Sequence, residues 1–314
     1  MNADDVWLQL YFKLRLYEAD GEAFQRLVSD VLLARHPDFV PVRPSGPIGD
    51  HGNDGYVPGE GMFFQVYGPS ASTHLSPRVA ANKARQDFAK LRSRYPDLRT
   101  YGFVLNDRFQ GVPAAVFDVL HDLQQETGVT CEPIAAGRLL DWFMALPQDR
   151  RKLIVQGVPS RLPDWVDPRA VGEILQHLAD RTAPWRTARA MSAEFDAKLR
   201  FNGLEGEAAD WLRALSYQTY LIDEFLAARG SYLAQSVAED MRDLYRRSVE
   251  AIPQTDPDAP ALRYVWMAER LIPSDANAHP HSLKAYREAA RVVLSKYFEA
   301  CNVYEQPGMG RRPT

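Results

Sequence analysis

The sequence predicts an α/β domain with a mixed sheet flanked by helices, followed by an all-helical domain. In the first half of the 314 residues the expected elements run helix, strand, strand, helix, strand, helix, strand, an order that favours a mixed sheet packed between helices. Strand signals stop near residue 156, and helical periodicity continues beyond it. The length suits about two domains of roughly 100 to 200 residues each. We therefore expect an α/β domain in residues 1–155, a linker region in 156–189, a helical domain in 190–305 and a mobile tail in 306–314.

The first expected elements are helices. Val6 to Tyr17 mixes apolar and basic residues and is expected to form a short helix or arm, with a break at Asp20-Gly21. From Glu22 to Arg35, apolar residues recur every three or four positions, which predicts an amphipathic helix ending before Pro37. The residues of that apolar face are Phe24, Leu27, Val28, Val31 and Leu32.

A glycine-rich stretch, GDHGNDGY at residues 49–56, leads into a predicted hairpin. Phe39 to Val42 is expected to be a strand, and a second strand includes or adjoins Asp54. A turn at residues 57–61 then connects to a strand at Met62 to Tyr67. Alternate residues of a strand face the same side, so Gln65 and Tyr67 should emerge together, with Asp54 opposite Gln65. This acid and polar pair form a candidate metal site.

A strongly polar helix is expected from Pro77 to Tyr95. It carries six cations against a single acid, Asp87, although the chain as a whole is acidic. Such a run is either a solvated helix face or a site for phosphate groups. The cations are Arg78, Lys83, Arg85, Lys90, Arg92 and Arg94.

The remaining segments complete the sheet and the helical domain. Strands are expected at Thr100 to Leu105 and Thr130 to Ile134, and helices at Val112 to Glu126 and Ala136 to Met144. Aromatic residues of the second half fall at helical spacings, so they are expected in a core or an interface. The helical segments of this half include Ala208 to Ala228, Tyr232 to Ala251 and Ser282 to Ala300.

Composition and missing motifs exclude several classes. The net charge of -4 and pI near 6.0 mean that any nucleic-acid contact must come from a local patch or a partner. The two cysteines, Cys131 and Cys301, lack metal-ligand spacing, which argues against a zinc site and fits a reducing compartment. No segment has the length of a membrane helix and the first residues do not resemble a signal peptide, so we expect a cytoplasmic protein without membrane contact. No phosphate-binding loop is present, so an ATPase activity would belong to a partner.

The first half resembles the Mrr-like branch of the PD-(D/E)xK nuclease superfamily. The resemblance lies in Phe24-Gln25 on a helix, in the segment GNDG at residues 52–55, and in QVY at residues 65–67. The same pattern is similar to effectors of bacterial ABC-three-component defence systems. The segment EFDAKLRFNGL at residues 194–204 resembles the start of the helical C-terminal domain of such effectors. Together the two resemblances cover residues 18–145 and 190–300.

The resemblance implies a restriction-endonuclease-like fold and a DNA endonuclease that depends on Mg²⁺ or Mn²⁺. It makes Asp54, Gln65 and Glu22 the metal ligands, and Tyr67 a hydrogen-bonding partner of the phosphate or the attacking water. Two positions depart from the pattern: Gln25 replaces a glutamate and Tyr67 replaces the catalytic lysine, whose role passes to Lys83 on the next helix. Arg78, Lys83, Arg85 and Lys90 would bind DNA.

The expected setting is a prokaryotic antiviral system. The partners implied are DNA and other subunits of the system, an ABC-type ATPase among them. The chain is also expected to form a homo-oligomer, and its helical domain to mediate oligomerisation or to bind the partner subunits. The alternative is a catalytically inactive nuclease fold that serves as an interaction or nucleic-acid-sensing subunit. Metal dependence of activity separates these two hypotheses.

Overall fold

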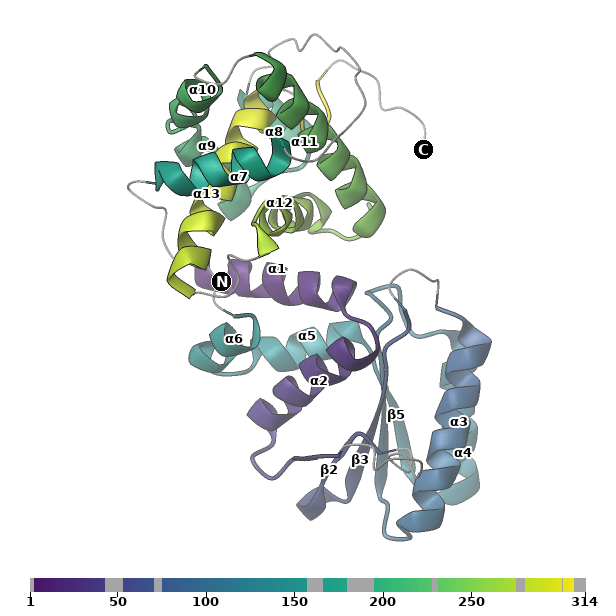
Figure 1. Cartoon of the computed structure of the whole chain (residues 1–314). Coiled ribbons are helices and arrows are strands. Elements are labelled where there is room, and N and C mark those ends of the chain that lie inside the picture. Colours follow the sequence, from purple (N-terminus) through teal and green to yellow (C-terminus); the bar gives the residue numbers. More distant parts are fainter. Residues whose placement is uncertain are drawn as a thin grey trace. The chain divides into compact units, whose positions relative to one another are not determined.

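The computed structural model describes residues 3–42, 53–70, 75–156, 166–179, 195–227, 231–274, 280–300 and 302–307. The chain divides into two compact units (Figure 1). Tyr11–Val158 form one, which we call the sheet unit, and Met1–Leu10 together with Pro159–Thr314 form the other, which we call the helical unit. The sheet unit is α/β with a mixed sheet, and the regular elements among the described residues of the helical unit are helices. The predicted fold class is therefore confirmed.

The sheet unit is built on five strands whose spatial order follows the chain, β1-β2-β3-β4-β5. The β1–β2 and β2–β3 pairs are antiparallel, whereas β3–β4 and β4–β5 are parallel. The first strand is shorter than the expected Phe39 to Val42, although the Val42 N–H still donates to the Asp54 carbonyl over 3.0 Å. The strands are β1 (Val40–Pro41), β2 (Gly55–Val57), β3 (Met62–Tyr67), β4 (Thr100–Leu105) and β5 (Thr130–Ile134).

Two helices cover one face of this sheet. The chain passes from β3 to β4 through α3 (Pro77–Arg94) and from β4 to β5 through α4 (Ala114–Thr127). Both crossovers step in the same direction across the sheet, so right-handed connections place both helices on one face. In Figure 1 α3 and α4 lie side by side there. The core between sheet and helices includes Phe63, Tyr101, Phe103, Leu105, Ala80, Ala84, Phe88, Leu91, Val116 and Leu120.

Helix α2 (Gly21–Arg35) packs against β3, and all five residues of its predicted apolar face are buried. Its start is fixed close to the end of β3, because the Gly21 N–H donates to the Gly68 carbonyl over 2.9 Å. A Cβ at Gly68 would lie 2.8 Å from the Cβ of Phe24, so only glycine permits this approach. The contact brings the first turns of α2, including Gln25, to the edge of the β2–β3 hairpin.

Buried polar contacts tie the N-terminal helix into the sheet unit. Helix α1 (Ala3–Glu18) contributes its residues from Tyr11 onward to this unit. Asn106, which follows β4 and is fully buried, donates to the carbonyls of Leu16 and Ala19 over 2.8 and 2.9 Å. The remaining helices of the unit are α5 (Ala136–Met144) and α6 (Gln148–Ile154).

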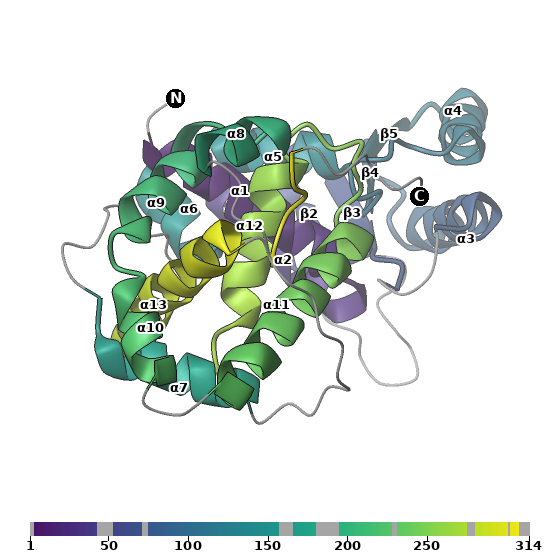
Figure 2. The same cartoon turned by 90° about the horizontal axis from the view of Figure 1, so that it is seen from above.

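In the helical unit, α13 (Pro280–Glu299) packs against α7 (Pro168–Ala179), α9 (Gly206–Ser216) and α12 (Ala259–Arg270) (Figure 2). Helix α7 falls within residues 156–189, where a linker was expected. The single helix predicted from Ala208 to Ala228 is interrupted, because Thr219 donates its hydroxyl to the Ser216 carbonyl and ends α9. The helices are α7 (Pro168–Ala179), α8 (Phe195–Phe201), α9 (Gly206–Ser216), α10 (Tyr220–Ala227), α11 (Ser231–Ala251), α12 (Ala259–Arg270) and α13 (Pro280–Glu299). None of the helices in the described ranges is both long and apolar enough to cross a membrane.

The first residues of α1 belong to the helical unit through Trp7. Its ring is 1% exposed and lies edge-on to Trp211, with 5.5 Å between centroids, and 6.2 Å from the ring of Tyr264. The guanidinium of Arg291, on α13, lies 5.4 Å from the Trp7 ring centroid and 4.6 Å from that of Trp211. A buried cation held by aromatic faces thus joins the N-terminal segment to α9, α12 and α13.

Candidate functional site

Asp54 lies immediately before β2, at the end of the hairpin. The pairing of Gly55 with Phe64 places it beside Gln65 on the neighbouring strand. Its backbone N–H donates to the Phe64 carbonyl over 2.8 Å, and its carboxylate Oδ2 accepts the Val66 N–H over 2.7 Å. The side chain thus extends the strand pairing beyond β2, and only 6% of the residue is exposed.

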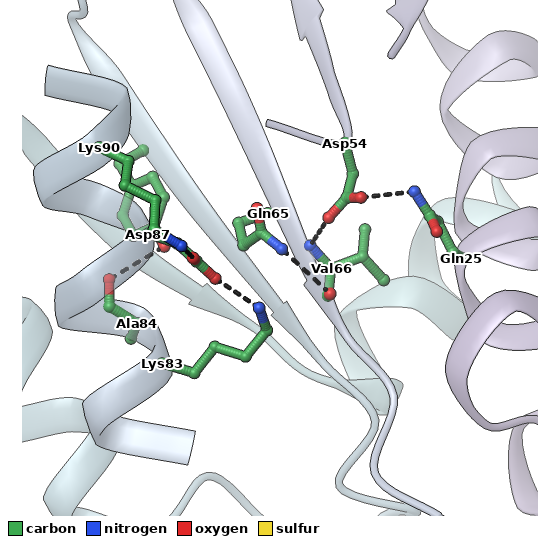
Figure 3. Close-up of polar contacts among 9 residues, drawn as sticks. Gln25, Asp54, Gln65, Val66, Lys83, Ala84, Asp87 and Lys90 are labelled. Carbon is green, nitrogen blue, oxygen red and sulfur yellow. Dashed lines mark hydrogen bonds and ion pairs between the residues drawn. The ribbon is translucent and has the colours of Figure 1, made fainter. Parts of the chain in front are cut away.

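Gln25 of α2 holds the second carboxylate oxygen. Its side-chain Nε2 donates to Oδ1 of Asp54 (Figure 3). A glutamate, which the Mrr-like pattern has here, would set a second negative charge against this carboxylate, whereas the amide stabilises the charged form by hydrogen bonding. The substitution is therefore consistent with a charged Asp54 side chain in a fixed orientation.

Gln65 is the second polar residue of the pair and is 3% exposed. Its Nε2 lies 3.4 Å from the Val66 carbonyl oxygen. Its Oε1 is buried and has no hydrogen-bond partner among the described residues. An orphaned carbonyl costs about 1–3 kcal/mol in a folded protein. A ligand that coordinates or donates to this oxygen would remove that cost.

Three groups that carry oxygen therefore lie at Val66: the Asp54 carboxylate, which accepts the Val66 N–H, the Val66 carbonyl, and the side-chain amide of Gln65, whose nitrogen lies near that carbonyl. These are ligands that Mg²⁺ prefers. The described residues hold no group of three or more His, Cys, Asp or Glu side chains that could bind a metal. An ion here would depend on one carboxylate, neutral oxygens and water, which suits Mg²⁺ because it usually retains several waters.

Four further residues of the sequence lie near this stretch of the chain or were expected at the site. The Glu22 side chain is 88% exposed and lies 3.3 Å from Arg26 on the same helix. Asp50 and His51 fall outside the described residues. Tyr67 is half-buried on the same strand as Gln65, with its ring centroid 6.3 Å from that of Phe103.

Lys83 lies on α3 and contacts an acid of its own helix. Its Nζ is 2.6 Å from Oδ2 of Asp87, and Nζ of Lys90 is 3.1 Å from Oδ1 of the same carboxylate. In Figure 3, Gln65 lies between this group and the pair formed by Asp54 and Gln25. The structure thus pairs Lys83 with Asp87, a residue that the sequence analysis counted only as the lone acid among cations.

The outer surface of α3 is basic. Arg78, Arg85 and Lys90 are exposed, and Arg85 lies 3.5 Å from Asp122 of α4. The one acid of the helix, Asp87, is buried and pairs with Lys83 and Lys90, so the six cations of the helix still leave a positive net charge. A surface of this kind is suited to a polyanion.

In the helical unit, residues 195–204 contact the end of the described chain through two polar side chains. Lys198 is buried and donates to the carbonyls of Phe298 and Val303, each over 2.7 Å. The Asn202 side chain accepts the Glu305 N–H and donates to the Glu305 carbonyl. A cavity of about 870 Å³ adjoins these contacts and is lined by, among others, Phe201, Tyr245, Val249, Asp256, Arg263 and Tyr304.

Comparison with known proteins identifies the helical domain. Residues 169–305 match the family model CTD10, described as C-terminal domain 10 of the ABC-three component (ABC-3C) systems. The helical C-terminal domain expected from the resemblance is thus confirmed, and the match points to a component of a multi-subunit prokaryotic defence system. The matched range starts beyond the sheet unit. Comparisons with curated proteins and with solved structures give no significant match.

Proposed function

We propose that the chain is a metal-dependent DNA endonuclease effector of a prokaryotic antiviral defence system. The observation that supports this most directly is that the Asp54 carboxylate and the buried Gln65 amide both lie at Val66. The side-chain oxygen of Gln65, Oε1, has no hydrogen-bond partner among the described residues. Buried orphan oxygens are rare and call for an explanation such as a bound ion. The CTD10 match supplies the defence context.

In this proposal each side chain has a separate task. Asp54 and Gln65 hold a Mg²⁺ or Mn²⁺ ion, and Gln25 orients the carboxylate through its hydrogen bond. A bound ion would supply Lewis-acid chemistry and an activated water. The ammonium group of Lys83 would stabilise the negative charge that develops on the phosphate. The Tyr67 hydroxyl would donate a hydrogen bond to the phosphate or the attacking water.

DNA would bind along α3. Arg78, Lys83, Arg85 and Lys90 provide the positive charge that phosphate groups require. The chain as a whole has a net charge of -4, so its affinity for DNA should be low and strongly dependent on salt when it acts alone. Assembly with other subunits of the system, an ABC-type ATPase among them, or into a homo-oligomer through the helical unit would raise the local concentration of these patches.

Plasmid cleavage tests the proposal. Purified wild-type protein would be incubated with supercoiled plasmid in Mg²⁺, Mn²⁺ or EDTA, alone and with its partner subunits. We expect nicking or linearisation in either metal and none in EDTA. Cleavage that persists in EDTA would exclude the metal site. No cleavage under any condition, with normal folding and partner binding, would favour the alternative below.

The alternative is an inactive nuclease fold that senses nucleic acid or connects subunits. Two observations favour it: Tyr67 stands where the catalytic lysine is expected, and the described residues contain no cluster of three potential metal-ligating acids, histidines or cysteines. Such a protein would bind DNA through α3 in a metal-independent manner. Binding that EDTA leaves unchanged, together with no cleavage, is its expected signature.

Replacing Gln65 by methionine should separate stability from activity. The change removes the orphaned carbonyl from a buried position while nearly conserving volume, so we expect stability to rise by about 1 kcal/mol. Metal-dependent cleavage should fall because a ligand is lost. Thermal unfolding and plasmid cleavage measure the two effects.

Gln124→Met is the matched control. The Gln124 side-chain carbonyl accepts the Cys131 N–H over 3.0 Å, so the same substitution there removes a satisfied hydrogen bond. It should lower the melting temperature and leave cleavage unchanged. A Gln65→Met protein that is less stable than wild type would contradict our interpretation of the orphaned oxygen.

A further inference from the structure

Asp87 is a buried acid on the face of α3 that packs against the sheet. It is 3% exposed and lies on the same helix face as the buried Ala80, Ala84 and Leu91. A charged carboxylate in such a position is strongly destabilising unless it is paired. Lys83 and Lys90 pair with it from the preceding and following turns, one ammonium group on each carboxylate oxygen.

The group formed by Lys83, Asp87 and Lys90 keeps a positive net charge. Two ammonium groups meet one carboxylate, so one positive charge remains. The carboxylate is inaccessible, with 4% of the Asp87 side chain exposed, whereas the Lys83 and Lys90 side chains are 39% and 61% exposed. An ammonium group has three N–H donors, and Asp87 occupies one on each lysine. The others can meet an incoming anion.

A buried tyrosine of β4 contacts the part of α3 that carries this group. The fully buried Tyr101 donates its hydroxyl to the Ala84 carbonyl over 3.2 Å. Burial raises the pKa of this phenol well above its usual value, and the charges of Asp87, Cys131 and Asp54 raise it further. In Figure 3, Gln65 lies between Asp87 and Asp54.

We propose that Asp87 is a positioning residue that fixes the ammonium group of Lys83 for phosphodiester hydrolysis. This inference rests on the proposed nuclease function. A lysine side chain has about 2 kcal/mol of rotamer entropy, and an exposed ammonium group would sample many positions. The short contact with a buried carboxylate restricts Lys83 to one of them before the phosphate arrives. Such preorganisation matters because a displacement of about 1 Å can slow catalysis about 100-fold.

A double-mutant cycle tests the role. Wild type, Asp87→Asn, Lys83→Met and the double variant would be compared for plasmid cleavage in Mg²⁺, with kcat and KM measured separately. We expect Asp87→Asn to lower kcat about 10- to 100-fold with little change in KM. The double variant should cut no more slowly than Lys83→Met, because residues that act through one another are not additive.

Two further variants separate positioning from structure. Asp87→Glu keeps the charge and should recover part of the lost kcat, and it also serves if Asp87→Asn fails to fold. Asp118→Asn removes an exposed acid from neighbouring α4 and should cut as wild type does. Melting temperatures of all variants show whether a loss of activity follows a loss of stability.

Several outcomes would overturn the inference. One is a folded Asp87→Asn protein that cuts at the wild-type rate. Another is an Asp87→Asn effect of equal size in the Lys83→Met background, which would assign the acid a structural role. If wild type itself does not cut in any metal, the proposed function fails and the inference falls with it. The wild-type reaction therefore distinguishes the two failures.

Discussion

Asp54→Asn is expected to reduce metal-dependent cleavage at least 100-fold while the sheet unit stays folded. The substitution removes the carboxylate that accepts the Val66 N–H, next to the Gln65 amide. Loss of one well-placed electrostatic group at a reaction centre commonly costs about 100- to 1000-fold in rate. Initial rates of plasmid nicking in Mg²⁺ and Mn²⁺ measure this effect.

The fold should tolerate this change because asparagine can keep both hydrogen bonds. Its Oδ1 can accept the Val66 N–H in place of the carboxylate oxygen, which does so over 2.7 Å. Its Nδ2 would face Gln25, whose amide can turn to present its own oxygen. Asp54→Ala, by contrast, would leave the Val66 N–H unpaired at a cost of about 1–3 kcal/mol, so a loss of activity there would be harder to assign.

A binding measurement provides a readout besides activity. A metal that binds only the folded state raises the melting temperature with concentration. We expect Mg²⁺ or Mn²⁺ to stabilise wild type and to have little effect on Asp54→Asn. The exposed Asp97 of the same unit supplies a control, since Asp97→Asn should keep both cleavage and the metal response. An equal metal response in wild type and Asp54→Asn would remove Asp54 from the ligand set.

The parts of the site that the sequence predicted depend on local patterns. Alternation along a strand places Gln65 and Tyr67, and the five-residue apolar face of α2 is buried as its spacing predicts. The hairpin puts Asp54 beside Gln65 because a short turn fixes the register of both strands. The interaction of Gln25 with Asp54 was not predictable in the same way, because it joins a helix and a strand that are separate in sequence.

Asp87 could have been found from the sequence. The spacing of Ala80, Ala84, Asp87 and Leu91 places Asp87 on the apolar face of the helix. A buried carboxylate there needs a partner of opposite charge, which a cation three or four residues away can provide. Counting charges over the whole helix hid this, because the count treats all of its faces alike. Helix α7 was hidden in a similar way by the proline-rich residues that precede it, although its apolar residues have helical spacing.

The division of the chain into units was not accessible from periodicity. Trp7 and Phe12 belong to one continuous helix, yet Trp7 packs in the helical unit and Phe12 stacks on Phe143 in the sheet unit. Periodicity reports that a face is apolar but not which core receives it. Non-local contacts of this kind are specified by the complementarity of the packed surfaces.

Trp7→Ala is expected to destabilise the helical unit by about 3–5 kcal/mol, the usual cost of removing a large buried aromatic side chain. The cavity would open beside Trp211 and Tyr264, and Arg291 would lose one of the two indole rings that hold its charge. For a unit of this size the loss corresponds to roughly 10 °C in melting temperature. Thermal unfolding followed by calorimetry or circular dichroism would show it.

Two variants control this prediction. Tyr217, an aromatic residue of the same unit, has 85% of its surface exposed, so Tyr217→Ala should change stability by no more than about 0.5 kcal/mol. Trp7→Phe keeps an aromatic face for Arg291 and should cost less than Trp7→Ala. If Trp7→Ala and Tyr217→Ala are equally stable, the first residues do not contribute to the helical core. If the prediction holds, the region that matches CTD10, residues 169–305, needs the distant N-terminal residues to reach full stability. A fragment that starts at residue 159 should then unfold at a lower temperature than the full chain of 314 residues.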